Sequence, residues 1–183
     1  AEKRELSHWN MMSWDNYVVW GEGQKRFVKS FVKNNPIIHI VSDIPYFDSN
    51  DELIEVPRRS IAAFDIQPKR HYLRSITPQL YEYINEDLLK RFLNDLGEIS
   101  NIYDVMLIRK RKKRLGSGQE KHLKKIEEGF SKKYKNTVSI DPGISAHRLI
   151  EKVDLVISMP FTSTAIIAYN MGKKCCYYDP SGL

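Results

Sequence analysis

Three consecutive hydroxyl side chains could bind a phosphate group. Thr162, Ser163 and Thr164 stand between an apolar run that predicts a strand and a segment that predicts a helix. The free N–H groups and the positive dipole end of that helix could act together with the hydroxyls on a phosphate. A single hydroxyl would be explained as a helix cap, since Ser and Thr are preferred there. Three in succession are more than capping requires, so a phosphate site and a simple cap both stay open.

A run of six basic residues, Arg109 to Arg114, follows a strand predicted at 104–108. Arg109 and Lys110 are expected at the end of this strand, and Arg111 would share the side of Arg109 if the strand continues. Arginine presents a fork that suits phosphate. The later members are expected in a solvated loop, and a solvated face is the general explanation of such runs. Nucleic acid is a disfavoured partner, because aromatic residues are not interleaved with the basic ones as base stacking needs.

Three further polar residues are expected at strand ends, where open parallel sheets bind ligands. Asp65 lies near the end of a strand predicted at 61–66, and its carboxylate could orient a sugar or act as a base. It could equally cap the following turn, which is the slightly favoured interpretation. Asp141 and Ser145 bound a turn before a short predicted helix that Ser145 would cap.

The spacing of the histidines and cysteines predicts no metal site. The five histidines lack the spacing of zinc ligands, and Cys175 and Cys176 are adjacent instead of forming a CxxC. Adjacent cysteines cannot join distant parts of a fold, and they fit a reducing compartment. The motifs GxSxG, GxxxxGK[ST] and GxGxxG are absent, so serine-hydrolase, P-loop and dinucleotide fingerprints are missing.

The composition is that of a folded domain with an uneven charge. The chain has 183 residues, 42% of them hydrophobic, and a net charge of +6. That length is enough for a core, and no apolar run approaches the roughly 20 residues of a membrane-spanning helix. Residues 61–183 carry 21 basic and 14 acidic groups, whereas 1–60 are nearly balanced. Such a surplus attracts phosphates, nucleic acid or an acidic membrane surface.

The elements that would position these residues alternate between strand and helix. Beyond residue 60, near-continuous apolar runs alternate with helical patterns, which predicts an α/β fold with a doubly wound, parallel, Rossmann-like sheet covered by helices on both faces. Gly97 is expected to end the first of these helices. The predicted strands are 61–66, 104–108, 137–140, 154–158 and 174–178, and the predicted helices are 78–96, 119–134, 145–153 and 164–171.

A short β-α-β segment precedes this sheet, with strands expected at 17–20 and 37–41 and a helix at 24–33. An acidic, proline-containing connection follows it. We therefore predict two domains: residues 1–57 as the end of a partner domain with its linker, and 58–183 as the Rossmann-like domain. The missing initiating Met and the stop just after a strand favour a fragment of a longer protein, truncated at its C-terminus.

The run DPGISAHRLIEKVDLVISMPFTSTAIIAYNMGKKCCYYDPSG, residues 141–182, resembles the donor-binding, C-terminal half of bacterial GT-B glycosyltransferases of surface polysaccharide biosynthesis. Upstream, VVWGEGQKRFVKSFVKNNPIIHIVSDIPYFD resembles the closing β-α-β segment of their acceptor-side domain. The resemblance implies transfer of a sugar from a nucleotide-activated donor, without a metal or other cofactor, in lipopolysaccharide or capsule synthesis. Most of the acceptor domain is missing, and with it the general base, so we expect this chain alone to be inactive.

The resemblance also implies roles for the residues already named. Thr162, Ser163 and Thr164 would hold the donor phosphate, and Arg109 and Arg111 would neutralise charge on the leaving nucleotide. The segment 141–145, with Asp141 and Ser145, would contact the nucleoside. The expected partners are a nucleotide sugar, a glycan or lipid-linked acceptor and, peripherally, an anionic membrane. The expected location is the cytoplasm, at the inner face of the membrane.

Two other functions stay open at the level of sequence. A nucleotide-sugar epimerase shares the two-domain architecture, and transfer of sugar to a polysaccharide acceptor would exclude it. A non-catalytic basic module on membrane or RNA would bind with a steep salt dependence that is lost when Lys110 to Arg114 are neutralised.

Overall fold

The computed structural model describes residues 13–41, 55–57, 59–68, 85–112, 120–160 and 162–182. The chain divides into two compact units, Ala1–Pro45 and Tyr46–Leu183, and each is described by itself. The boundary predicted between residues 57 and 58 lies inside the second unit. The identities predicted for the two domains, acceptor side and donor side, remain predictions.

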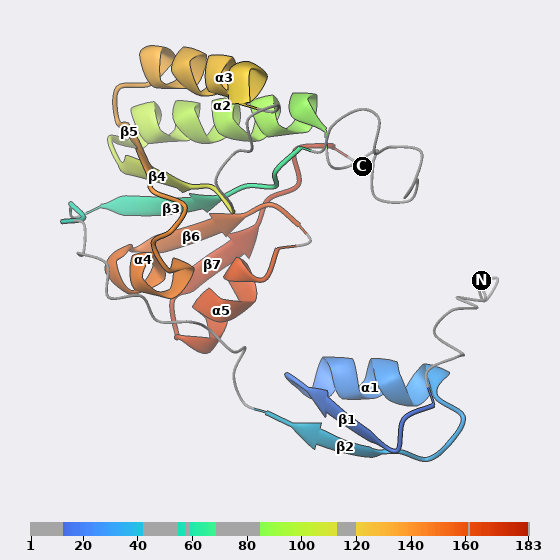
Figure 1. Cartoon of the computed structure of the whole chain (residues 1–183). Coiled ribbons are helices and arrows are strands. Elements are labelled where there is room, and N and C mark those ends of the chain that lie inside the picture. Colours follow the sequence, from blue (N-terminus) through green and yellow to red (C-terminus); the bar gives the residue numbers. More distant parts are fainter. Residues whose placement is uncertain are drawn as a thin grey trace. The chain divides into compact units, whose positions relative to one another are not determined.

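The N-terminal unit is a β-α-β segment, shown in blue in Figure 1. Strands β1 (Asn16–Val19) and β2 (Ile37–Ile40) pair in parallel, and helix α1 (Glu22–Phe31) connects them. Glu22 in the first turn complements the helix dipole, and apolar residues recur at helical spacing along the side that faces the strands. The three elements lie within a few residues of their predicted positions.

The second unit is built on a five-stranded parallel sheet with the strand order β5-β4-β3-β6-β7. Its helices lie on both sides of this sheet (Figure 1), so the predicted doubly wound α/β fold is confirmed. The strands are β3 (Ser60–Phe64), β4 (Met106–Lys110), β5 (Thr137–Ile140), β6 (Leu155–Ser158) and β7 (Lys174–Tyr177), and the helices are α2 (Glu86–Tyr103), α3 (Glu120–Lys133), α4 (Ala146–Lys152) and α5 (Thr164–Asn170).

Alternation along the strands separates two apolar cores. Ala63 and Leu107 point to the face covered by α2 and α3, where they pack with Phe92 and Leu93. Their neighbours Ala62 and Ile108 point to the opposite face, covered by α4 and α5. Because both faces of the central strands are buried, the middle residues of these strands are apolar, as is typical of parallel sheets.

Helix α2 is longer at its C-terminal end than the sequence predicts. The side chain of Asn85 caps its start by accepting a hydrogen bond from the Leu88 N–H at 2.8 Å, and Asp104 ends it in the left-handed conformation. The prediction that Gly97 stops the helix is wrong. Gly97 lies inside α2, where a Cβ would come within 2.5 Å of the Tyr134 ring, so this glycine permits close packing of α2 on the end of α3. The predicted start at residue 78 lies outside the described residues.

Strand β4 also differs from its prediction, running from Met106 to Lys110 instead of from 104 to 108. Arg109 and Lys110 lie inside the strand, as expected for its end, and they are 3% and 7% exposed. Charged residues are buried only when partners satisfy them, so the surroundings of these two residues define much of the site.

Candidate functional site

The strand order reverses beside the central strand β3. The chain moves from β3 to β4 and β5 on one side and then crosses to β6 and β7 on the other. Ligands of open α/β sheets bind outside the carboxyl ends of the strands at this reversal. Here a hydrogen bond from the Met159 N–H to the Phe64 carbonyl, at 2.9 Å, joins the carboxyl ends of β6 and β3. The chain after Met159 leads to the three hydroxyls.

Thr162 and Thr164 belong to a hydrogen-bond network that shapes the turn after β6. The Thr162 hydroxyl donates to the Met159 carbonyl at 2.8 Å, and the Thr164 hydroxyl lies 3.3 Å from that of Thr162. Ser158, at the end of β6, places its hydroxyl 2.8 Å from that of Thr164. We call Thr162, Ser163 and Thr164 the hydroxyl turn.

Ser163 is the exposed member of the hydroxyl turn, and its side chain makes no capping hydrogen bond. It occupies the N-cap position of α5 and is exposed. The capping interpretation therefore explains its position but not its hydroxyl. The three predicted hydroxyls lie in one turn at the carboxyl edge of the sheet, and Ser163 is the exposed residue among them.

Arg109 is held by two carboxylates. Its Nε donates to Asp65 Oδ2 at 2.5 Å and its Nη1 donates to Glu127 Oε1 at 2.8 Å. Burial lowers the pKa of Arg109, but these carboxylates outweigh it and the net pKa is raised. Burial raises the pKa of Asp65, and the Arg109 guanidinium opposes that rise. Asp65 and Arg109 are 2% and 3% exposed as side chains, so they form an internal ion pair.

Arg111 lies at the open end of the same cluster. Its Nε is 3.5 Å from Glu127 Oε1 and its side chain is 26% exposed. Its Nε atom is buried and has no hydrogen-bond partner in the described part of the chain, an arrangement that is uncommon in folded proteins. The two arginines face two carboxylates, Asp65 and Glu127, so the formal charge of this cluster is zero.

Lys110 points to the opposite face and holds the turn after β5. Its Nζ donates to the Pro142 carbonyl at 3.1 Å and to the Arg111 carbonyl at 3.4 Å. Burial lowers the pKa of this ammonium, whereas Asp141 and Asp65 act in the opposite direction. Asp141 Oδ1 accepts a hydrogen bond from the Gly143 N–H at 2.6 Å, which closes the turn tightly.

The sheet thus divides the predicted site residues into two groups. Asp65, Arg109 and Arg111 lie on the side of α2 and α3, because Glu127 of α3 binds both arginines. The hydroxyl turn and the Asp141–Ser145 turn lead into α5 and α4 on the other side. Ser145 occupies the predicted cap position of α4 but makes no side-chain capping bond.

Two residues of the site were not predicted as ligand residues, Lys110 and Tyr177. The Tyr177 hydroxyl donates to the Thr162 carbonyl at 2.7 Å and so fixes the hydroxyl turn from β7. The sequence signal that could have found both residues is the alternation of side chains along a strand. Lys110 follows the buried Ile108 by two positions, and Tyr177 follows Cys175 by two. Such spacing places each of them on the inner face covered by α4 and α5.

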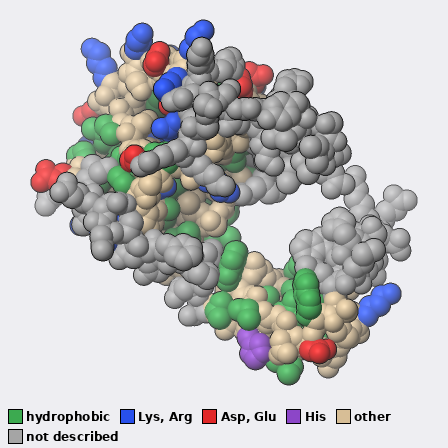
Figure 2. All heavy atoms as spheres, viewed as in Figure 1, with side chains coloured by type: hydrophobic (Ala, Val, Ile, Leu, Met, Phe, Trp, Pro, Cys, Tyr) green, Lys and Arg blue, Asp and Glu red, His purple; other side chains and the backbone are tan. Residues whose placement is uncertain are grey.

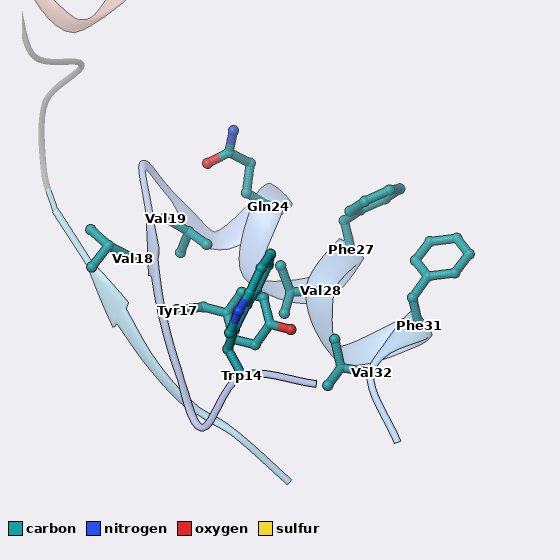
Figure 3. A pocket seen from close by; sticks show the side chains of 9 residues that line it. All are labelled: Trp14, Tyr17, Val18, Val19, Gln24, Phe27, Val28, Phe31 and Val32. Carbon is teal, nitrogen blue, oxygen red and sulfur yellow. The ribbon is translucent and has the colours of Figure 1, made fainter. Parts of the chain in front are cut away.

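Two other features of the described surface are an apolar pocket and a group of exposed lysines. A pocket of about 250 Å³ in the N-terminal unit lies between α1 and β1 and is mainly apolar (Figure 3). Figure 2 shows Lys and Arg side chains on the helical layer of the second unit, where α3 exposes Lys124, Lys125, Lys132 and Lys133. Within the described ranges, no group of three His, Cys, Asp or Glu residues is suited to a metal ion. No helix in those ranges has both the length and the apolar character for crossing a membrane.

Comparison with known proteins gives one family. Residues 1–183 match the family described as "Polysaccharide biosynthesis PFTS motif protein". The chain carries the sequence P-F-T-S at 160–163, and Thr162 and Ser163 of the hydroxyl turn are its last two letters. No curated protein matches the chain. The match over the whole chain shows that the protein belongs to the polysaccharide biosynthesis PFTS motif family.

Proposed function

We propose that the chain is the donor-binding part of a glycosyltransferase of polysaccharide biosynthesis, and that the hydroxyl turn binds the phosphate of a nucleotide-activated sugar. The observation that carries this proposal is that Ser163 is exposed and makes no capping hydrogen bond with its side chain. It stands on a turn that neighbouring hydroxyls hold, at the point where the strand order reverses. The coincidence of this turn with the P-F-T-S sequence of a polysaccharide biosynthesis family supports it.

In the proposed reaction, an acceptor hydroxyl oxygen forms a bond to the sugar's anomeric carbon and loses its proton to a general base. The bond from that carbon to a phosphate oxygen breaks, and the phosphate oxygen gains negative charge. The hydroxyl turn donates hydrogen bonds to the phosphate, and Arg111 stabilises the developing charge from across the sheet edge. The buried Nε of Arg111 supports this role, because it lies 3.5 Å from Glu127 but has no hydrogen-bond partner in the described residues. The Asp141–Ser145 turn contacts the nucleoside.

Arg109 and Asp65 act as supports in this proposal. Arg109 is expected to help neutralise the leaving nucleotide, but it is 3% exposed and bound to two carboxylates. We therefore assign it mainly to holding Asp65 and Glu127, next to Arg111. The Asp65 carboxylate is similarly enclosed, so we favour a positioning role over proton transfer.

The acceptor in this proposal is a glycan or lipid-linked sugar, in lipopolysaccharide or capsule synthesis. The exposed lysines of α3 support a peripheral contact with an anionic membrane. We place the reaction in the cytoplasm, at the inner membrane face, because the free thiols of Cys175 and Cys176 fit a reducing compartment. The proposal uses no metal or other cofactor.

A thermal-shift screen of the 183-residue chain tests the proposal. The ligands are UDP, GDP, ADP and CMP, each with a corresponding nucleotide sugar. A ligand at 100 times its Kd stabilises the folded state by about 2.7 kcal/mol, which raises the melting temperature by about 5–10 °C. A rise with one nucleotide class and not with inorganic phosphate supports a nucleotide-sugar site. The absence of any rise at millimolar ligand would contradict it.

A further inference from the structure

The last residues of the five strands form one row across the second unit's sheet. The strand register pairs Lys110 with Phe64 and with Ile140, and it pairs Ser158 with Phe64 and with Tyr177. Residues paired in a parallel register point to the same face. Phe64 and Ile140 belong to the core under α4 and α5, so the whole row faces that side at the carboxyl edge. We call these five residues the terminal row.

Each polar member of the terminal row binds a turn that follows a strand. Lys110 Nζ donates to the Pro142 carbonyl, in the turn after β5, at 3.1 Å. The Ser158 hydroxyl meets that of Thr164 at 2.8 Å, and the Tyr177 hydroxyl donates to the Thr162 carbonyl at 2.7 Å. A row that is otherwise apolar therefore places three polar groups where they hold two turns.

We infer that Lys110 and Tyr177 are positioning residues that hold the Asp141–Ser145 turn and the hydroxyl turn in the geometry that binds the donor. This inference rests on the proposed function, because it concerns the same site. Neither residue needs to touch the donor. Each acts through a backbone carbonyl, Lys110 on the turn assigned to the nucleoside and Tyr177 on the turn assigned to the phosphate.

The physical reason is pre-organisation of short turns. A turn that is already fixed loses less conformational entropy when a ligand binds, so removing a hydrogen bond that fixes it weakens binding. The Thr162 carbonyl directly precedes Ser163, so the bond from Tyr177 sets the direction in which the exposed Ser163 hydroxyl leaves the turn. Lys110 is 7% exposed and lies on β4, two strands away from Ser158 on β6, where it holds the Pro142 carbonyl.

The test uses Tyr177→Phe and Lys110→Met in the full 183-residue chain. Tyr177→Phe removes one hydroxyl from a ring that is 46% exposed, so this variant is expected to fold even if Lys110→Met does not. Matched controls are Tyr169→Phe, on the 75% exposed tyrosine of α5, and Lys174→Met, on an exposed lysine of β7. The measurements are the Kd for UDP, GDP, ADP or CMP, whichever binds wild type most tightly, the amide hydrogen exchange of the two turns, and the melting temperature.

We expect Tyr177→Phe to weaken nucleotide binding about fivefold to tenfold, as the loss of one hydrogen bond does. Faster amide exchange should be confined to residues 162–164, with the melting temperature close to that of Tyr169→Phe. Lys110→Met should show the same pattern at residues 141–145. If wild type binds a nucleotide and Tyr177→Phe binds it equally well, the inference is wrong and the proposed function stands. If wild type binds none of the four nucleotides, both are wrong.

Discussion

Arg109 and Asp65 form a buried ion pair in which each residue depends on the other for its charge. Breaking a buried pair from one side leaves an uncompensated charge and costs about 3–5 kcal/mol. We predict that Asp65→Ala lowers the free energy of unfolding by that amount, measured by urea denaturation. Glu127 keeps one bond to Arg109 in the variant, which places the expected cost nearer the lower value.

The control for this prediction is Asp87→Ala. Asp87 pairs with Lys90 at 3.3 Å on the surface of α2, with side chains 92% and 44% exposed. Surface pairs contribute about 0–1 kcal/mol, so this variant should unfold almost like wild type. Equal, small losses for both variants would show that Asp65 and Arg109 do not form an internal pair in solution.

Tyr178 links the end of β7 to α2 and makes the free energy of unfolding depend on pH in the alkaline range. Burial and a 2.5 Å hydrogen bond from its hydroxyl to Asp95 raise its pKa from 10.0 to about 12. The folded state therefore favours the neutral phenol. This contribution to stability is complete below pH 10 and is lost as the pH rises from about 10 to about 12.

We predict that Tyr178→Phe is less stable than wild type at pH 8 and that the difference shrinks between pH 10 and 12. Chemical denaturation at several pH values measures it, with Tyr103→Phe, on a 66% exposed ring, as the control. A difference that stays constant across this range would mean that the bond to Asp95 does not form.

At the scale of single residues, the sequence indicated which residue types stand at the candidate site but not which contacts they make. It singled out Arg109 and Asp65, but their pairing joins residues 44 positions apart in the chain, and no local pattern reports such a contact. The face of the sheet on which Lys110 lies could be predicted, because Ile108 stands two positions earlier in a strand that continues to residue 110. The bond from Tyr177 to Thr162 depends on β7 lying beside β6, which the strand order decides.

At the scale of elements, the packing of α2 against the end of α3 depends on a glycine. A Cβ at Gly97 would lie 2.5 Å from the Tyr134 ring, whereas a Cβ at Gly129 of α3 would meet nothing within 4 Å. We predict that Gly97→Ala lowers the free energy of unfolding by about 1–3 kcal/mol because the buried Tyr134 must shift.

Gly129→Ala is the matched control, since alanine is the better helix former by about 1 kcal/mol. It should leave stability unchanged or raise it in the same urea titrations. The packing described for α2 would be contradicted if Gly97→Ala were also neutral or stabilising, because intrinsic helix propensity would then decide both positions.

Most elements could be predicted because periodicity is a local property. Strand β5 was predicted with its observed bounds, 137–140, and α5 with its observed start at Thr164. The errors occurred where distant packing overrides local preference. Gly97 reads as a helix end because glycine is common there, but the contact with Tyr134 explains it instead. Strand β4 continues through two basic residues because their partners on other elements satisfy them.

For the whole molecule, the alternation of strands and helices predicted the doubly wound sheet, and the order β5-β4-β3-β6-β7 is the basis on which we propose the site. The net charge of +6 was a weaker guide. Near the site, Asp65 and Glu127 cancel Arg109 and Arg111, and lysines on α3 carry exposed positive charge elsewhere. The proposed phosphate site therefore rests on hydroxyls and topology, and the exposed lysines of α3 support only the proposed contact with a membrane surface.

Isothermal titration calorimetry of the hydroxyl turn tests this account most directly. Wild type, Thr162→Ala/Ser163→Ala and the control Ser139→Ala, on an exposed serine of β5, are titrated with the nucleotide that stabilises wild type most. The double variant loses the hydrogen bond from Ser163 to a charged phosphate and the Thr162 bond to the Met159 carbonyl that shapes the turn, which predicts a Kd about a hundredfold weaker, and the control predicts an unchanged Kd. A double variant that binds the nucleotide as tightly as wild type would contradict a phosphate site at the hydroxyl turn.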